Sequence, residues 1–235
     1  MLTLEGVTLR HDAFQLEARF SVPKGARVAV IGPSGAGKST LLAAIAGFQP
    51  LAAGRVVWDG EDMSAFHPGA RPMSILFQDN NLFPHLSVAD NVGLGLRPDL
   101  RLSRAEADRV AAVLARVGLE GLGDRKPRAL SGGQAGRVAL ARVLLRARPL
   151  MLLDEPFAAL GPGLRQDMLD LVADLCAEIG ATLLMVSHDP EDARRIADHI
   201  VFVADGKAEA PAPTEQLFAA SSEALARYLG SRPPK

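Results

Sequence analysis

The chain has 235 residues, 48% of them hydrophobic, which is enough to build one large core or a core with an inserted lobe. Its net charge of −1 offers no overall attraction for nucleic acid or for an anionic membrane surface, so composition argues against a nucleic-acid partner. No apolar run approaches the roughly 20 residues that cross a bilayer, and the N-terminus lacks the regions of a signal peptide, so we expect a chain that stays in the cytosol.

The N-terminal part of the chain carries short strand signals. We predict turns at residues 23–25 and 59–60 and strands over residues 2–8, 16–21 and 55–58. A continuous apolar run at residues 26–31 indicates a buried parallel strand, and residues 41–46 indicate a helix that Gly47 ends.

The segment between this buried strand and this helix is rich in glycine. It satisfies the phosphate-loop pattern G-x-x-x-x-G-K-S/T with Gly32, Pro33, Ser34, Gly35, Ala36, Gly37, Lys38, Ser39 and Thr40. Glycines let the backbone approach phosphate oxygens, Lys38 adds a charge for the β- and γ-phosphates, and the Ser39 hydroxyl can bind Mg²⁺. The segment therefore predicts a site for a nucleoside triphosphate. The strand and the helix that flank it disfavour the alternative, a glycine-rich turn that opens an ordinary helix.

The middle of the chain changes to a helical pattern. A strand at residues 74–77 leads into Gln78, whose amide can bridge a metal ion or an attacking water. Residues 87–122 are helical in pattern, with Ser103 and Glu106 as a capping-box pair and apolar residues at helical spacing after them. We therefore expect an inserted helical subdomain over approximately residues 87–148.

A second candidate phosphate-binding surface opens a helix inside this subdomain. The helix begins with Leu130, Ser131, Gly132, Gly133 and Gln134. Ser131 can cap the helix and the glycines expose backbone N–H groups, so this N-terminus could face a γ-phosphate. The alternative, an N-cap with a flexible turn, is disfavoured by the full five-residue motif.

Polar residues follow two later strands. Asp154 and Glu155 come after the apolar strand 150–153, and His188 comes after the strand 182–186. We expect Asp154 to bind Mg²⁺, Glu155 to act as general base on water, and His188 to contact the γ-phosphate. Each is commonly a solvated or structural residue when isolated, and only the combination with the phosphate loop predicts hydrolysis. We assign no zinc site to the remaining histidines, His11, His67, His85 and His199.

The C-terminal half alternates strands with helices. We predict a helix near residues 163–179, a strand at residues 200–203 and a short helix within residues 214–228 of the proline-punctuated tail 208–235. Cys176 falls on the apolar face of the first of these helices, where core packing is favoured over redox chemistry. The alternation predicts a single α/β domain over residues 1–235, with a mostly parallel sheet and helices on both faces.

These motifs resemble those of the ATP-binding subunits of ABC transporters, over nearly the whole chain. By this resemblance residues 32–40 are Walker A, Gln78 is the Q-loop residue, residues 130–134 are the ABC signature, residues 150–155 are Walker B with its catalytic glutamate, and His188 is the switch histidine. The resemblance also implies a P-loop NTPase fold with an N-terminal antiparallel β subdomain, and ATP and Mg²⁺ as ligands.

The family works as a head-to-tail pair. The resemblance therefore implies a homodimer in which ATP on Lys38 of one copy is covered by Ser131, Gly132 and Gly133 of the other. It also implies a transmembrane permease partner that is contacted near Gln78, and a periplasmic solute-binding protein that acts indirectly. The subunit would lie peripherally on the cytoplasmic face of the inner membrane.

The transported solute is indicated only by finer likeness. Residues 77–83, 91–96 and 182–188 look most like those of bacterial thiamine-importer ATP-binding subunits, and residues 208–235 are too few for the regulatory β domain of some other importers. Iron(III), spermidine or another small solute stays an alternative. So do a soluble ABC ATPase of DNA repair or translation, and a regulatory module that binds ATP without turnover.

Three features depart from the family pattern. Gly161 ends the segment 158–161 where the family usually reads Ser-Ala-Leu-Asp, and we expect slower hydrolysis or weaker communication between the two sites of a dimer. Gly136 lies inside the signature helix, where glycine costs about 1 kcal/mol relative to alanine. For the aromatic that stacks on adenine, both His11 and Phe14 are candidates.

Overall fold

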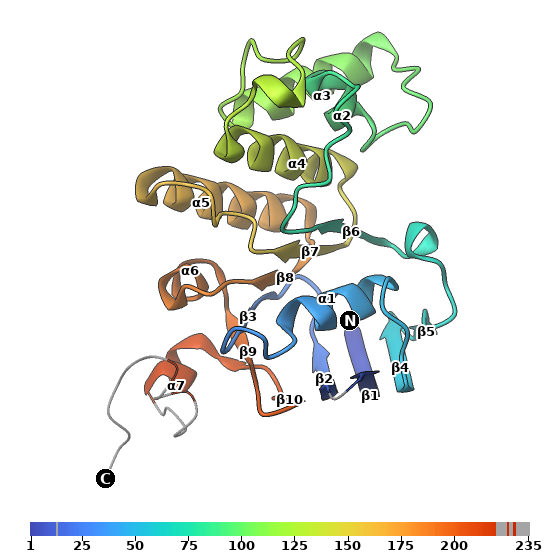
Figure 1. The fold of residues 1–235 in the computed structure, drawn as a ribbon, viewed down its shortest axis with the longest axis vertical. Helices are drawn as coiled ribbons and strands as arrows, with labels where there is room; N and C mark the ends of the chain where they lie inside the picture. Colours follow the sequence, from blue (N-terminus) through green and yellow to red (C-terminus); the bar gives the residue numbers. More distant parts are fainter. Residues whose placement is uncertain (13, 220–224, 226–227, 229–235) are drawn as a thin grey trace.

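The computed structural model describes residues 1–12, 14–219, 225 and 228 (Figure 1). Its strands are β1 (Leu2–His11), β2 (Phe14–Val22), β3 (Arg27–Ile31), β4 (Ala53–Trp58), β5 (Glu61–Asp62), β6 (Met73–Leu76), β7 (Leu150–Asp154), β8 (Thr182–Val186), β9 (His199–Ala204), β10 (Lys207–Ala208) and β11 (Ala212–Pro213). Its helices are α1 (Lys38–Ala46), α2 (Val88–Gly93), α3 (Arg104–Arg116), α4 (Gly132–Arg146), α5 (Pro162–Ile179), α6 (Pro190–Ile196) and α7 (Thr214–Ala219), with 3-10 turns η1 (Pro68–Ala70) and η2 (Pro127–Ala129).

The strands form one sheet with a parallel and an antiparallel part. The order is β5-β4-β1-β2-β10-β9-β3-β8-β7-β6, and β11 pairs with β9. The strands β9, β3, β8, β7 and β6 are parallel neighbours, whereas β1 pairs antiparallel with β2 and β4. The predicted α/β class, with parallel central strands and an antiparallel N-terminal part, is confirmed, and the sheet as a whole is mixed because β5, β10 and β11 add further antiparallel pairings.

Alternate residues of the parallel strands enter two separate cores. In β3, Val28 and Val30 pack with α1 and the antiparallel strands, while Ala29 and Ile31 pack on the opposite face with residues of α4, α5 and α6. Because both faces of the sheet are covered, these strands are apolar at nearly every position. The continuous apolar run at residues 26–31 predicted a buried strand for this reason. Cys176 is buried in the second of these cores, as predicted, and burial raises the pKa of its thiol to about 11.

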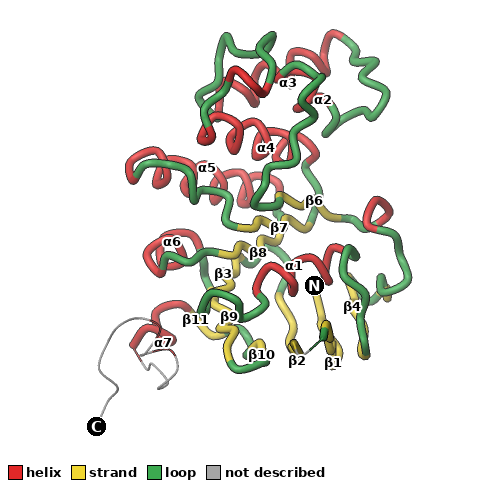
Figure 2. Tube along the Cα trace, viewed as in Figure 1, coloured by secondary structure: helices red, strands yellow, loops and turns green. Residues whose placement is uncertain are grey.

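The helical stretch at residues 87–122 contains two helices. Both α2 and α3 begin with a capping box, formed by Ser87 with Asp90 and by Ser103 with Glu106. Pro98 lies between them and cannot continue a helix. Figure 2 shows α2, α3 and α4 gathered at the end of the molecule away from β1, β2 and β4.

Some short elements were not predicted from the sequence. The strands β5, β10 and β11 have two residues each, too few for a periodic pattern, and α6 has seven. Of the helix predicted within residues 214–228, the structure gives α7, and most of the remainder lies outside the described residues. Within the part of the chain that is described, no helix has both the length and the apolar composition to span a membrane.

Candidate functional site

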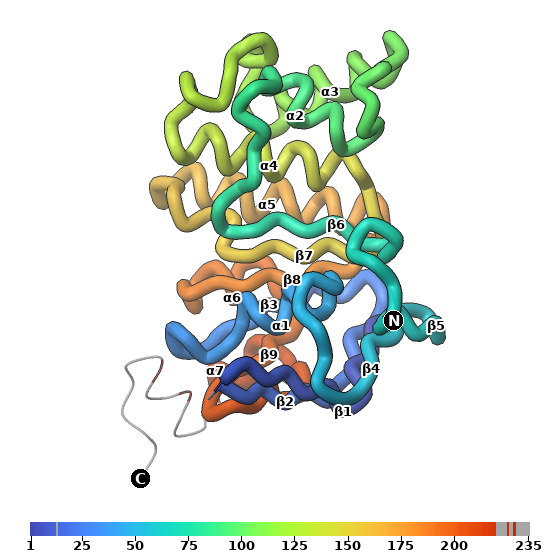
Figure 3. The backbone as a smooth tube through the Cα atoms, turned by 45° about the vertical axis from the view of Figure 1, so that its right-hand side comes forward, coloured from blue at the N-terminus to red at the C-terminus, as the bar shows by residue number. Residues whose placement is uncertain are grey.

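The polar residues that follow four parallel strands meet at one edge of the sheet. Since β6, β7, β8 and β3 are parallel neighbours in that order, their carboxyl ends lie side by side (Figure 3). Gln78 follows β6, Asp154 ends β7, His188 follows β8, and the segment 32–40 follows β3. The parallel topology therefore brings together the residues that the sequence singled out.

The segment 32–40 is held closed by a lysine. Lys38 is 7% exposed, and its Nζ donates hydrogen bonds of 2.8 Å to the carbonyl oxygens of Gly32 and Pro33. Burial lowers the pKa of Lys38, and the carboxylates of Glu155 and Asp154 oppose that shift. Gly32 has φ +149°, and a Cβ there would lie 2.0 Å from the Val203 carbonyl oxygen, so only glycine fits this approach to β9.

A hydroxyl and a carboxylate meet beside this segment. Ser39 Oγ donates a hydrogen bond of 2.9 Å to Asp154 Oδ1, and Asp154 is 5% exposed. Burial raises the pKa of Asp154, and the hydrogen bond from Ser39 opposes the rise. A buried carboxylate and a hydroxyl at one spot are the hard oxygen ligands that suit Mg²⁺. The described residues hold no group of three or more His, Cys, Asp or Glu that could bind a metal, so any metal shell here would also need other oxygen ligands, such as Ser39 Oγ.

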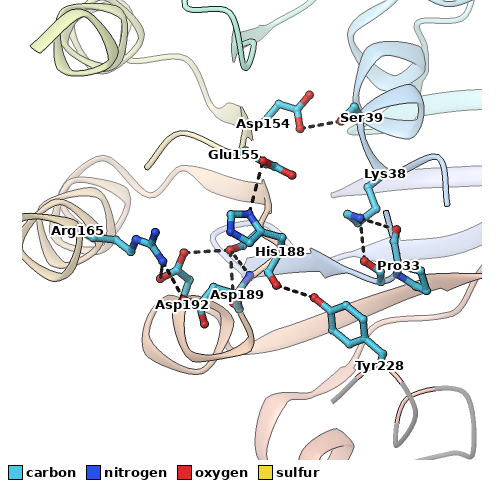
Figure 4. A network of polar contacts seen from close by, with 12 residues as sticks. Pro33, Lys38, Ser39, Asp154, Glu155, Arg165, His188, Asp189, Asp192 and Tyr228 are labelled. Atoms are coloured by element: carbon cyan, nitrogen blue, oxygen red, sulfur yellow. Dashed lines mark hydrogen bonds and ion pairs between the residues drawn. The ribbon is translucent and has the colours of Figure 1, made fainter. Parts of the chain in front are cut away.

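Glu155 lies beside His188 rather than beside Ser39. Glu155 has a left-handed backbone, φ +45°, and its N–H donates 3.1 Å to the Val186 carbonyl oxygen. This turn sends its side chain away from that of Asp154, as Figure 4 shows. His188 Nδ1 lies 3.5 Å from Glu155 Oε2, and the His188 side chain is 57% exposed. A strained backbone residue at the end of a central strand is typical of a functional site.

These residues surround one cavity of 610 Å³. Its lining comprises Phe14, Gly32, Ser34, Gly35, Gly37, Lys38, Ser39, Thr40, Gln78, Glu155, His188 and Tyr228. The Pro33 carbonyl oxygen accepts from Lys38 and also from the Ala36 N–H. Asp154 lines the neighbouring groove. Of the two aromatic candidates Phe14 lines the cavity, whereas the side chain of His11 is 74% exposed beside Asp12.

The motif at residues 130–134 lies elsewhere. Ser131 caps α4: its Oγ accepts from the Gln134 N–H at 3.3 Å, and Gln134 Oε1 accepts from the Ser131 N–H at 2.9 Å. Ser131 and Gly132 are exposed, and none of Ser131, Gly132, Gly133 and Gln134, all described residues, lines the cavity. This helix end is therefore open to contact from outside the subunit.

Two groups at the site were missed by sequence reasoning. The Tyr228 hydroxyl donates 2.9 Å to the carbonyl oxygen of His188, 40 residues away, and no local pattern signals such a contact. Asp189 caps α6 ahead of Pro190 and pairs with Arg165. An Asp-Pro-Glu run is a recognisable helix start and could have been found.

The comparisons with known proteins agree in one family. The sequence profile described as "ABC transporter" matches residues 16–158. "Thiamine import ATP-binding protein ThiQ" of Cereibacter sphaeroides is 59% identical, over 98% of this chain and 100% of that protein. The protein of the same name from a Ruegeria species is 57% identical, again over 98% of this chain and 100% of its own length.

A solved structure has the same architecture. The dimeric post-hydrolysis state of the ATP-binding cassette MJ0796, bound to ADP and Pi, superposes with a TM-score of 0.82 at 30% identity, over 91% of this chain and 99% of that one.

Proposed function

The chain belongs to the ABC transporter family, and we propose that it is the subunit that binds and hydrolyses ATP to drive the import of thiamine. The observation that carries the ATPase assignment is the meeting of Lys38, Glu155 and His188 around one cavity. The thiamine assignment is supported by the names of relatives that match over nearly the whole chain. Iron(III) and spermidine are the alternative solutes, and a transport assay must distinguish thiamine from them.

The cavity would hold ATP by its phosphates and its base. Backbone N–H groups of residues 32–40 and the N-terminus of α1 face the phosphates, and Lys38 exchanges its bonds to Gly32 and Pro33 for phosphate oxygens. Phe14 lines the cavity at its β2 wall and offers an aromatic face to adenine.

Hydrolysis then needs a base and a group that responds to developing charge. Glu155 accepts the proton of a water whose oxygen attacks the γ-phosphorus, while the bond from that phosphorus to the oxygen of ADP breaks. His188, 3.5 Å from Glu155, orients the carboxylate and can donate toward the γ-phosphate. Mg²⁺, when bound at Ser39, Asp154 and Gln78, supplies charge neutralisation on the phosphates.

A second copy of the chain would complete the site. Ser131 and Gly132 stand exposed at the start of a 15-residue helix and do not line the cavity of their own subunit, as judged within the described residues. A head-to-tail homodimer places this helix N-terminus against the γ-phosphate bound by the other copy. The dimeric cassette with ADP and Pi supports that arrangement.

The permease is proposed to dock beside Gln78. An apolar groove of 610 Å³ is lined there by Phe48, Phe77, Gln78, Asp79, Asn81 and Asp154. Phe48 is 56% exposed, and its ring meets that of Phe77 edge-on at 5.1 Å between centroids. Because Gln78 lines both the groove and the ATP cavity, a partner here would sense the nucleotide. The subunit would lie on the cytoplasmic face of the inner membrane, and the periplasmic thiamine-binding protein would act through the permease.

Replacing the proposed base tests the ATPase assignment. Glu155→Gln keeps the shape of the side chain and removes its basicity, so we expect ATP turnover to fall by at least a hundredfold while ATP binding persists. With Mg²⁺ and ATP, size-exclusion chromatography should then show a long-lived dimer. The matched control is Glu120→Gln, at an exposed position outside the cavity, which should hydrolyse ATP like the wild type. Unchanged ATP turnover in Glu155→Gln would contradict the assignment of this cavity as the site of ATP hydrolysis.

A further inference from the structure

The loop that carries His188 is fixed from behind by a polar cluster. His188 stands between Ser187 and Asp189, and neither neighbour lines the ATP cavity. Ser187 Oγ donates 2.9 Å to Asp192 Oδ2 and accepts 3.1 Å from the Asp189 N–H. The backbone on each side of His188 is therefore tied to the first turns of α6.

One cation holds this cluster together. Arg165 Nη1 donates 2.8 Å to Asp189 Oδ2 and lies 3.8 Å from Asp192 Oδ1 (Figure 4). The side chains of Arg165 and Asp192 are 20% and 11% exposed, so the pair is shielded from water more than the ion pairs of the outer surface. Burial raises the pKa of Asp192, and Ser187 and Arg165 oppose that rise.

Arg165 comes from the helix that follows the 158–161 segment. It lies in the first turn of α5, where its N–H donates 2.9 Å to the Gly161 carbonyl oxygen. Its side chain also lines a void of 10 Å³ whose other walls include Glu155 and His188. The same residue thus belongs to the start of α5, binds the His188 loop through Asp189, and lines a space that Glu155 also lines.

We propose that Arg165 is a positioning residue for ATP hydrolysis: by binding Asp189 and Asp192 it fixes the 187–189 loop and holds His188 close to Glu155. The inference rests on the proposed ATPase function and adds a residue that does not line the ATP cavity. Losing Arg165 would free the loop, so His188 would spend less time beside Glu155, and the chemical step would slow while ATP binding stayed intact.

The chain offers a matched control in the same pair of helices. Arg195 of α6 binds Asp170 of α5 through two hydrogen bonds, of 2.8 and 2.6 Å. This ion pair also joins α6 to α5, but it contacts neither the 187–189 loop nor the cavity among the contacts described. A purely structural tie between the helices would therefore respond alike to Arg165→Gln and Arg195→Gln.

Steady-state ATPase assays on the full chain test the proposal. We expect Arg165→Gln to lower kcat about tenfold with the KM for ATP within twofold of wild type, and Arg165→Lys to recover part of the loss. Arg195→Gln should keep both constants within twofold. Equal kcat in wild type and Arg165→Gln, or equal losses in Arg165→Gln and Arg195→Gln, would overturn the proposal.

A second readout does not depend on turnover. The histidine NMR signal that disappears in His188→Gln should shift in Arg165→Gln and stay in place in Arg195→Gln. An unshifted signal would overturn the proposal, and Arg165→Lys serves for both measurements if the Gln variant does not fold. Suppose that the wild-type chain hydrolyses ATP, that Glu155→Gln is inactive and that Arg165→Gln is fully active. This result would contradict the inference about Arg165 and leave the proposed function intact. A wild-type chain without ATPase activity would contradict the proposed function as well.

Discussion

Gly161 can be replaced by aspartate without strain. The replacement separates the effect of this position on helix stability from its effect on ATP hydrolysis. Gly161 is the N-cap of α5 with φ −69° and ψ 160°, and no side chain caps this helix. Ser131, which caps α4, has nearly the same angles, φ −70° and ψ 161°. A Cβ at Gly161 would meet no atom within 4 Å. An aspartate therefore fits in the conformation that capping residues prefer.

The gain in stability follows from capping and from the helix dipole. Replacing glycine by a capping side chain gains a few tenths of a kcal/mol, and a negative charge at a helix N-terminus adds about 0.3–1 kcal/mol. For a domain of this size the sum should raise the melting temperature by about 1–6 °C. Thermal unfolding followed by circular dichroism measures this effect.

The effect on catalysis needs a control that caps without charge. Gly161→Asn should gain the capping part of the stability, and Gly161→Asp should in addition raise the ATPase rate or its cooperativity, since the segment 158–161 is proposed to join the two sites of the dimer. Assays over a range of ATP concentrations give the rate and the Hill coefficient. Equal rates and Hill coefficients in wild type, Asn and Asp variants would refute the idea that the missing carboxylate weakens communication.

Changes at the adenine wall, in the signature helix and at Asp154 also have defined outcomes. Phe14→Ala should weaken ATP binding about three- to tenfold in a fluorescence titration, whereas His11→Ala should leave it unchanged; the reverse order would contradict the placement of adenine. Gly136→Ala should raise the free energy of unfolding by about 0.5–1 kcal/mol, because the added methyl meets nothing closer than 3.5 Å. Gly133→Ala should gain less than Gly136→Ala, since its methyl would lie 2.9 Å from Leu160 Cδ2 and that side chain must shift; equal gains in denaturant melts of the two variants would contradict this. Burial holds the pKa of Asp154 above its unfolded value near 4, so the nucleotide-free protein should lose stability as pH rises from that value through the raised pKa. In Asp154→Asn the contribution of Asp154 to this loss disappears, so the total loss in melts between pH 4 and 7 should be smaller than in wild type, with buried Asp192 supplying part of the remainder. A loss equal to that of wild type would assign it to other groups.

Local signals explain which parts of the fold were predictable. The strands β3, β7 and β8 are short apolar runs bounded by turn residues, and the capping boxes of α3 and α4 are visible in four residues each. The site was predictable in outline because parallel strands deliver their carboxyl ends to one edge, so residues following four strands had to meet.

Contacts between distant segments account for what was missed. Arg71, 3% exposed, donates to the carbonyl oxygens of Ala44 and Ile45 at the end of α1, 27 and 26 residues earlier. Tyr228 and Arg165 likewise act on the His188 loop from other elements. Such contacts depend on how the elements pack against one another, so no periodicity or local motif in the sequence predicts them.

The most direct measurement of the central claim is ATP hydrolysis by this subunit in liposomes that hold its permease, with the thiamine-binding protein added in its loaded and unloaded forms. Stimulation by the thiamine-loaded protein alone, abolished by Glu155→Gln, is the result that the account predicts. Hydrolysis that ignores thiamine but responds to iron(III) or spermidine carriers would contradict the proposed solute, and no hydrolysis under any condition would contradict the ATPase assignment itself.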